Sequence, residues 1–276
     1  MDRRRGARAL GLLLLGAISG FATCRVVPPL GGSLAEHFAI DSLGLEIFLA
    51  GVALAGASLS RAPLRRRLGL GPSRIPARLL ATLVVGTVAV SHGLDGVIEL
   101  LELREKSSLA SFDVTLAGAR GSALVLALVG IGLAPAIAEE LLCRGLVQRG
   151  LLARFRPVVA IPLAAAFFGA LHIDPVHAVF ASLLGLYLGL AAYLAGSTRA
   201  AIVCHAVNNL LAVAVAARWP RLELSDPTST TAGFVLAAAC LWAVDRRATA
   251  ARLEGSRGNG WTPSTPVGPR ESDPGS

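Results

Sequence analysis

Residues 121–145 read GSALVLALVGIGLAPAIAEELLCRG and decide the fold class of this protein. Within this stretch, residues 121–138 carry no charge. A helix needs about 20 mostly apolar residues to cross a bilayer. Two adjacent carboxylates and an arginine follow at Glu139, Glu140 and Arg144. Ionisable groups at membrane depth are costly, so they indicate a functional site. We expect a transmembrane helix that carries such groups near one end.

The composition of the whole chain agrees with a membrane protein. Of its 276 residues, 54% are hydrophobic and 16% are charged, whereas a soluble domain is about 45–50% apolar and about 25% charged. The mean hydropathy is +0.63. This balance argues against an ordinary cytosolic enzyme, a disordered chain and a disulfide scaffold. The cysteines form no CxxC pair, so we expect no disulfide and no cysteine-based metal site.

Apolar segments recur along the chain and predict an all-α, polytopic transmembrane bundle of about eight helices. We interpret the first segment as a retained helix rather than a cleaved signal peptide, because no clear A-x-A site follows it. The third and eighth segments are short, and Ile98–Leu103 is expected to extend the third or to lie at the interface. The segments are Ala9–Val27, Leu43–Ser60, Leu79–His92, Ser122–Cys143, Pro157–His172, Val176–Gly196, Ala200–Ala217 and Thr231–Val244.

The net charge of +8 comes from arginines that gather in alternate connections, around residues 3–8, 61–78 and 144–156. Cytoplasmic loops carry such an excess of Arg and Lys. The pattern therefore predicts a multi-pass protein of the cell membrane with both termini in the cytoplasm, and no binding of nucleic acid. The connection with Arg104, Lys106 and Arg120 is a partial exception. The bias toward Arg, Ala and Gly suggests a GC-rich bacterial genome.

Spacing separates the roles of the two adjacent carboxylates. Glu140 and Arg144 are four residues apart, so on a helix they share a face and can pair. Glu139 points about 100° away and needs a partner from another helix. The plainer interpretation is that both carboxylates only mark the membrane edge.

The fifth apolar segment ends in an imidazole. His172 shares a helix face with Phe168, although a lone histidine near a helix end is more often structural than catalytic. His177 follows beyond Asp174-Pro175, which we expect to break the helix. The two histidines therefore need not face one site.

The seventh apolar segment carries an imidazole and two amides. His205 and Asn209 are four residues apart and share a face, with Asn208 as the less certain partner. Such groups are not expected to face lipid. The plainer interpretation is that they form interhelical hydrogen bonds that hold the bundle together.

The order Glu-Glu-x-x-x-Arg, then Phe-x-x-x-His, then His-x-x-x-Asn resembles the CPBP (Abi) family of intramembrane proteases, which includes the CAAX prenyl endoproteases. The resemblance covers about residues 122–214. It implies that Glu139 and His172 activate a water that attacks a peptide carbonyl, and that His205 and Asn209 stabilise the oxyanion. Glu140 and Arg144 would hold the helix end, with Phe168 and Asn208 in support. Cys143 stands where that family commonly has Phe.

The resemblance also divides the chain. We expect N-terminal transmembrane helices and loops in residues 1–120, a catalytic helical core in 121–217, a C-terminal transmembrane helix in 218–250, and a disordered cytoplasmic tail in 251–276. The tail is rich in Gly, Ser and Pro, a composition that cannot bury enough surface to fold.

Three functions are open from the sequence. The first is an intramembrane endopeptidase that acts on membrane-associated proteins or peptides. The second is a non-catalytic protein of the same fold, such as a bacteriocin immunity or scaffold protein. The third is a proton-coupled transporter with Glu139 as a relay. The expected partners are membrane lipid and a protein or peptide substrate.

No cofactor is preferred, although Glu139, His172 and His205 match the ligand types of many catalytic zinc sites. Zinc is therefore the alternative to a metal-free glutamate mechanism. The depth of these residues poses a difficulty. If Arg144 marks the membrane edge, Glu139 lies roughly 7 Å inside it, whereas His172 lies roughly 24 Å along its helix from Arg156. The site requires the fifth helix to tilt or to begin outside the bilayer.

Overall fold

A computed structural model describes residues 32–218 and 226–258, and within these ranges it contains helices and no strand. The all-α prediction is confirmed. The predicted first span, Ala9–Val27, lies outside the described residues. The helices are α2 (Leu34–Ser58), α3 (Leu64–Arg67), α4 (Ala77–Leu100), the short η1 (Arg104–Lys106), α5 (Ser108–Leu116), α6 (Gly121–Ala127), η2 (Leu128–Leu133), α7 (Ala134–Glu140), η3 (Leu141–Gln148), α8 (Arg149–Leu152), α9 (Pro157–Ala170), α10 (Pro175–Ala195), α11 (Thr198–Arg218) and α12 (Pro227–Gly258).

Within the described ranges, 6 helices are long and apolar enough to cross a membrane. Each of them corresponds to a predicted span, although the first and last residues differ from the predicted ones. The segment from α6 to α8 is continuous and forms one span, while α9 is a shorter apolar helix. The six are Leu34–Ser58, Ala77–Leu100, Gly121–Leu152, Pro175–Ala195, Thr198–Arg218 and Pro227–Ala250. Their length and composition are those of a multi-pass membrane protein.

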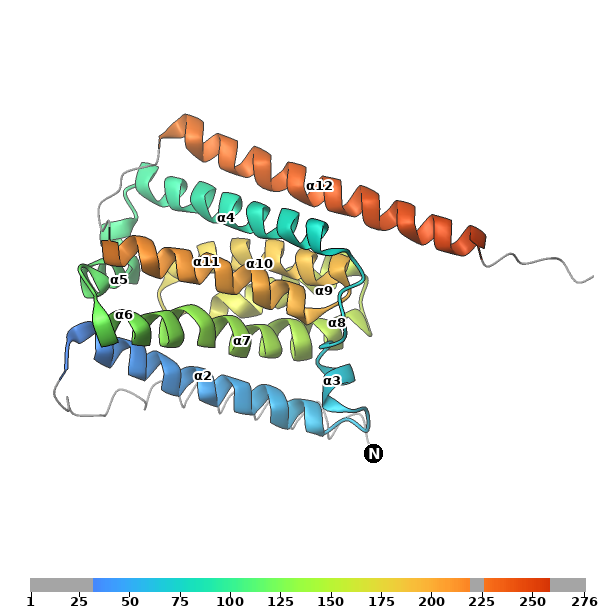
Figure 1. Ribbon diagram of the computed structural model, residues 1–276, viewed down its shortest axis with the longest axis horizontal. Helices are drawn as coiled ribbons and strands as arrows, with labels where there is room; N and C mark the ends of the chain where they lie inside the picture. Colours follow the sequence, from blue (N-terminus) through green and yellow to red (C-terminus); the bar gives the residue numbers. More distant parts are fainter. Residues whose placement is uncertain (1–31, 219–225, 259–276) are drawn as a thin grey trace, which may run out of the picture.

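The long helices lie side by side in a flattened bundle (Figure 1). The edges are α2, which packs against α6 and α7, and α12, which packs against α4. Between them α11 contacts both α4 and the α7 segment, and α9 and α10 pack on each other. The polar residues of interest come from α7, α9 and α11, so the topology brings them to the middle of the bundle.

Close packing in this bundle depends on small residues, as is usual between membrane helices. A Cβ at Gly169 of α9 would lie 1.9 Å from the Ser182 hydroxyl and 2.3 Å from the Ala178 carbonyl of α10. A Cβ at Gly130 would lie 2.3 Å from the Ala39 carbonyl of α2. These glycines let neighbouring backbones approach each other.

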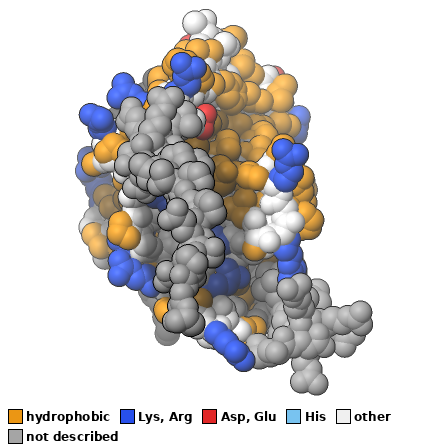
Figure 2. Space-filling view, turned by 90° about the vertical axis from the view of Figure 1, so that its right-hand side faces the viewer, with side chains coloured by type: hydrophobic (Ala, Val, Ile, Leu, Met, Phe, Trp, Pro, Cys, Tyr) orange, Lys and Arg blue, Asp and Glu red, His pale blue; other side chains and the backbone are white. Residues whose placement is uncertain are grey.

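The two ends of the bundle differ in charge. One end holds α3, the start of α4, α8 and the start of α11, and it carries the arginines of residues 61–78 and 149–156. Figure 2 looks onto this end and shows Lys and Arg side chains spaced between apolar ones. At the opposite end Arg104 forms ion pairs with Asp95, Glu99 and Asp113. One of the three cations that depart from the loop charge pattern is therefore neutralised.

Two boundaries differ from expectation. Helix α4 continues to Leu100, so part of the Ile98–Leu103 segment does extend that span. Helix α12 continues to Gly258, into the tail that we expected to be disordered from residue 251. The rest of that predicted tail lies outside the described residues.

Candidate active site

The adjacent carboxylates lie in a helix of irregular pitch. The regular turns of α7 are flanked by two π-helical segments, η2 and η3. Such wide turns occur frequently at functional sites because they leave backbone groups free and redirect side chains. Here the carbonyl of Gly130 in η2 accepts a hydrogen bond from Ser42 of α2 at 2.8 Å.

Glu140 and Arg144 form an ion pair inside the bundle, as their spacing predicts. Arg144 Nη1 lies 2.6 Å from Glu140 Oε1, and the two side chains are 1% and 0% exposed. Arg144 Nη2 also donates to the carbonyl of Gly185 on α10 at 2.8 Å. Its guanidinium lies 4.5 Å from the ring centroid of Phe168 on α9. Arg144 therefore ties three helices together.

Arg144 lies in the interior of the bundle. The helix that begins at Gly121 continues past Arg144 to Leu152, and the Arg144 side chain is 1% exposed. Glu139 lies about 20 Å from the end of this helix at Leu152, and His172 about 22 Å from the start of α9 at Pro157, at the usual rise per residue. The membrane edge that we expect near Arg144 stays a prediction.

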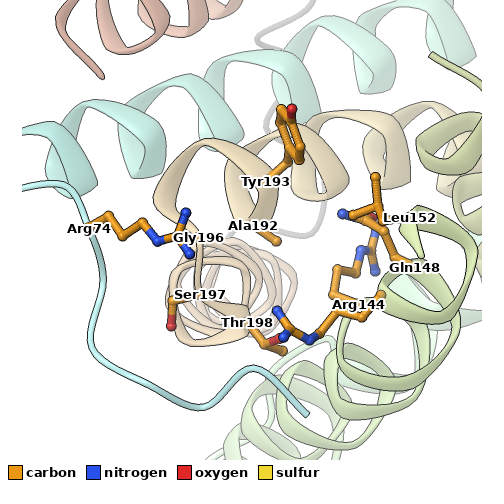
Figure 3. Close-up of a pocket in the computed structure, with 10 residues that line it drawn as sticks. Arg74, Arg144, Gln148, Leu152, Ala192, Tyr193, Gly196, Ser197 and Thr198 are labelled. Carbon is orange, nitrogen blue, oxygen red and sulfur yellow. The ribbon is translucent and has the colours of Figure 1, made fainter. Parts of the chain in front are cut away.

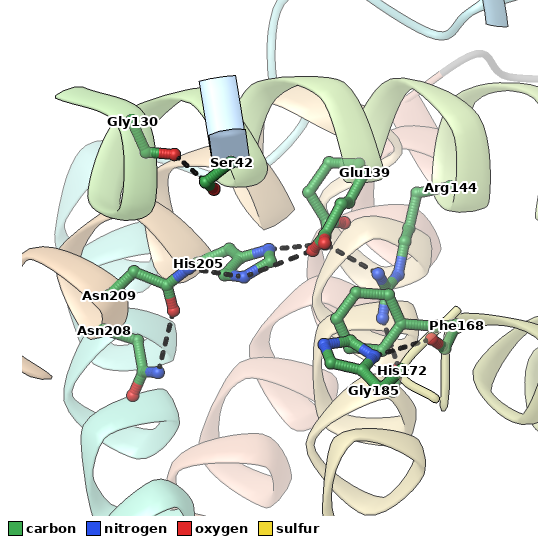
Figure 4. Close-up of polar contacts among 11 residues, drawn as sticks. Ser42, Gly130, Glu139, Arg144, Phe168, His172, Gly185, His205, Asn208 and Asn209 are labelled. Atoms are coloured by element: carbon green, nitrogen blue, oxygen red, sulfur yellow. Dashed lines mark hydrogen bonds and ion pairs between the residues drawn. The ribbon is translucent and has the colours of Figure 1, made fainter. Parts of the chain in front are cut away.

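His205 of α11 connects both carboxylates to the amides of its own helix (Figure 4). Its Nδ1 lies 3.0 Å from Glu140 Oε1, and its Nε2 lies 3.1 Å from Asn209 Nδ2. Asn208 Nδ2 in turn donates to Asn209 Oδ1 at 3.3 Å. These contacts assign a direction: Nδ1–H donates to Glu140, and Nε2 accepts from the Asn209 amide.

Glu139 is the carboxylate without a short partner. Its Oε2 lies 3.8 Å from His205 Nε2, beyond hydrogen-bond distance, and its side chain is 10% exposed. The predicted partner from another helix is thus His205, rather than the His172 that the family resemblance suggests. A buried carboxylate that is held near an imidazole and lacks a short hydrogen bond is available for chemistry.

A further buried carboxylate was missed by the sequence reasoning. Glu46 of α2 is 3% exposed, and its Oε2 has no hydrogen-bond partner within the described ranges. It is close enough to Glu139 for the two charges to interact. The sequence does contain a signal for this residue, because Glu46 is an acid inside the predicted Leu43–Ser60 span.

His172 lies on the other side of Phe168 from His205. The Phe168 ring meets both imidazoles edge-on, with ring centroids 5.3 Å from His172 and 5.8 Å from His205. His172 Nδ1 lies 3.2 Å from the carbonyl oxygen of Phe168. Among the described residues His172 forms no hydrogen bond with Glu139, so Phe168 is what holds this imidazole beside the site.

His177 is closer to the site than expected. The helix does break at Asp174-Pro175, because α10 begins at Pro175 and the Asp174 carboxylate caps it by accepting from the His177 N–H. Even so, the rings of His172 and His177 have centroids 4.3 Å apart. The break turns the chain back on itself, which brings the two imidazoles together instead of separating them.

The alternative metal ligands are not assembled. Within the ranges that the structure describes, no group of three His, Cys, Asp or Glu side chains is close enough to hold a metal ion. The phenyl ring of Phe168 packs against both His172 and His205, and His205 has both ring nitrogens engaged. The set Glu139, His172 and His205 therefore does not fit a zinc ion in this arrangement.

Residues 121–211 match the family model described as type II CAAX prenyl endopeptidase Rce1-like. This segment is an Rce1-like domain. The resemblance to CPBP proteases that the motifs carry is thereby confirmed. The Rce1-like domain includes the Glu139–Arg144 motif, His172, His205 and Asn209, whereas Glu46 precedes it. No curated protein and no solved structure matches the sequence.

Proposed function

We propose that this protein is an intramembrane endopeptidase that hydrolyses peptide bonds of membrane-associated proteins or peptides with a glutamate-activated water. The observation that carries the proposal is the contrast between two adjacent buried carboxylates. Glu140 Oε1 is held by both Arg144 and His205, although Glu140 Oε2 has no hydrogen-bond partner among the described residues. Glu139 has only His205 Nε2 nearby, at 3.8 Å. The Rce1-like domain supports the protease class.

In the proposed reaction Glu139 is the general base. It removes a proton from a water while the water oxygen attacks the carbonyl carbon of the scissile bond. The proton then passes from Glu139 to the leaving nitrogen as the C–N bond breaks, which yields a new carboxyl group and a new amine. An apolar surround favours this role, because a poorly solvated carboxylate accepts a proton more readily than one in water.

We assign direct stabilisation of the oxyanion to Asn209, with His205 holding the Asn209 amide in place. The Asn209 amide uses one N–H for His205 Nε2 and has a second N–H to donate. Glu140 and Arg144 keep His205 in a single tautomer and orientation, with Asn208 orienting the Asn209 amide. Donors fixed before the reaction stabilise developing charge without reorganisation.

His172 is proposed to position the attacking water. Its ring is held against Phe168, and a water can bridge imidazole and carboxylate groups that do not touch directly. This mechanism uses only side chains. We retain zinc as the alternative, and the two are separated by activity in the presence of phenanthroline, which a metal-free enzyme keeps.

We further propose that both termini lie in the cytoplasm, in a bacterial cell membrane, with membrane lipid and a protein or peptide substrate as partners. The charge difference between the two ends of the bundle supports this orientation.

The test compares membrane proteomes from strains that carry the wild type, Glu139→Gln or His172→Ala. Glu139→Gln keeps the size of the side chain but removes its basicity, so we expect loss of processing by at least about 10²-fold, within the range for a general base. Peptides and protein termini generated by the wild type should be missing in both variants.

His177→Ala is the matched control for His172→Ala, because both remove a half-buried imidazole from the same ring contact. We expect His177→Ala to process substrates far better than His172→Ala. Identical termini in the wild-type and Glu139→Gln strains would contradict the protease function. Equal losses in the two histidine variants would contradict the role assigned to His172.

A further inference from the structure

A polar cavity lies at the arginine-rich end of the bundle (Figure 3). It encloses about 380 Å³. Its buried lining includes Arg144, Gln148 and Thr198, while Arg74 and Arg149 are exposed at its rim. The remaining lining residues are Leu152, Ala192, Tyr193, Gly196 and Ser197. Among the residues that the structure describes, no acidic side chain lines the cavity.

Two glycines in the left-handed conformation make room for the rim arginines. Gly196 ends α10 with φ of 63°, and a Cβ there would lie 2.7 Å from Arg74 Cδ. Gly69 has φ of +66°, and a Cβ there would lie 2.9 Å from Arg149 Nη1. The backbone of Arg74 is also fixed, because its N–H donates to the Ala195 carbonyl at 2.8 Å. The position of both arginines is therefore built into the fold.

The positive charge at this rim is not compensated within the described residues. In the described part of the chain, the Arg149 guanidinium donates hydrogen bonds only to backbone carbonyls, those of Arg67 at 3.2 Å and Arg66 at 3.4 Å. Arg74 forms no ion pair in the described part of the chain. Arg67 and Arg74 are both near enough to repel Arg149 electrostatically. The cavity also backs onto Arg144, whose Nε has no hydrogen-bond partner.

The depth of the cavity indicates which anion it faces. Its residues come from the end of the Gly121–Leu152 span, the end of α10, the start of α11 and the segment before α4. Four apolar spans begin or end there, so the cavity lies at the level of lipid headgroups. Basic pockets between transmembrane helices at this level bind anionic headgroups, and guanidinium groups pair with phosphate through two hydrogen bonds.

We propose that this cavity is a binding site for the phosphate of an anionic glycerophospholipid, held by Arg74 and Arg149. The headgroup occupies the cavity between the two guanidiniums, and the acyl chains leave past the exposed Tyr193. The N-terminus of α11, a helix of 21 residues, adds a favourable dipole. This site is separate from the proposed protease chemistry and does not depend on it.

The test titrates the purified full-length protein in detergent with phosphatidylglycerol and counts bound lipid by native mass spectrometry. The variant is Arg74→Gln/Arg149→Gln, and the matched control is Arg61→Gln/Arg78→Gln, which removes the same charge from exposed positions at the same end. We expect phosphatidylglycerol to bind the first variant at least about tenfold more weakly than wild type, and the control within about twofold. Phosphatidylcholine should bind all three weakly.

Equal affinity of the two double variants would overturn the site. Arg74→Gln alone repeats the test with a side chain that makes no hydrogen bond in the described structure, should the double variant fold poorly. Inorganic phosphate separates the two sources of a phosphate group. The lipid assignment is overturned by one combination of results. Inorganic phosphate would raise the melting temperature of the wild type but not that of Arg74→Gln/Arg149→Gln, while phosphatidylglycerol would change the melting temperature of neither protein.

Discussion

At the scale of single residues, the site is organised by the buried charge of Arg144. Its guanidinium contacts Glu140, the Gly185 carbonyl and the Phe168 ring at once. A Cβ at Gly185 would lie 3.0 Å from Phe168 Cδ1 and 3.3 Å from Arg144 Nη2, so a glycine gives this arrangement its space. Removing one partner from such a pair leaves an uncompensated charge in an apolar interior.

We therefore expect Arg144→Met to destabilise the protein by about 3–5 kcal/mol. The double variant Glu140→Leu/Arg144→Met should be more stable than Arg144→Met, because it leaves no unpaired charge, although His205 Nδ1 loses its acceptor. Thermal unfolding in detergent measures both, with the exposed Glu105→Gln as the control. An Arg144→Met variant as stable as Glu105→Gln would contradict the structural role of this pair.

Glu46 allows a second prediction at this scale. Its buried Oε2 has no hydrogen-bond partner, and such a group costs stability unless function retains it. We expect Glu46→Leu to unfold at a higher temperature than the wild type and to process substrates more slowly. Melting curves and the proteome comparison measure the two effects. Normal processing in a stabilised Glu46→Leu variant would show that Glu46 takes no part in the site.

At the scale of elements, the approach of α9 to α10 sets the position of Phe168 and His172. Gly169 stands between these residues and packs directly on α10. A turn follows α9, and Asp174 caps the start of α10 after this turn. Helix α10 then runs back along α9. The site therefore depends on a backbone contact as much as on its polar side chains.

Gly169→Ala should separate the two helices, because its Cβ would collide with Ser182 and the Ala178 carbonyl. We expect a loss of about 1–3 kcal/mol, as for other overpacked positions, together with reduced processing. Gly44→Ala in α2 is the control, since nothing lies within 4 Å of its added Cβ. Alanine is the better helix former, so Gly44→Ala should be neutral or stabilising. Equal melting temperatures of the two variants would contradict the close contact.

At the scale of the whole molecule, charge and polarity are arranged along the bundle. Arginines that form no ion pair with the other described residues gather at one end, and the ion-paired Arg104 lies at the other. The helices that carry the candidate active site run between the two ends. Arg144 takes part in both regions. It lines the cavity that we propose binds lipid, and it pairs with Glu140 in the candidate active site.

Labelling of introduced cysteines tests the proposed orientation. Ser108→Cys and Ala153→Cys lie at exposed positions near opposite ends of the bundle, in a background without the native cysteines. We expect a membrane-impermeant maleimide to label Ser108→Cys in intact cells, and Ala153→Cys only after the membrane is opened. The reverse pattern would place the arginine-rich end outside the cell.

Much of this molecule follows from the sequence alone, for local reasons. Apolar runs predict membrane helices whatever their neighbours are, so the spans described by the structure agree with the predicted ones apart from their ends. The pairing of Glu140 with Arg144 and of His205 with Asn209 needed only the helical repeat. The motifs likewise sufficed to indicate the family.

Tertiary structure decided what no local pattern contains. Whether Arg144 lies on the surface of the bundle or in its interior depends on which helices surround it, and the structure encloses it between α9 and α10. The partner of Glu139, the proximity of Glu46 and the contact between His172 and His177 all arise from packing between helices. Helical periodicity specifies the face on which a side chain lies, but only the packing of the bundle specifies what that face meets.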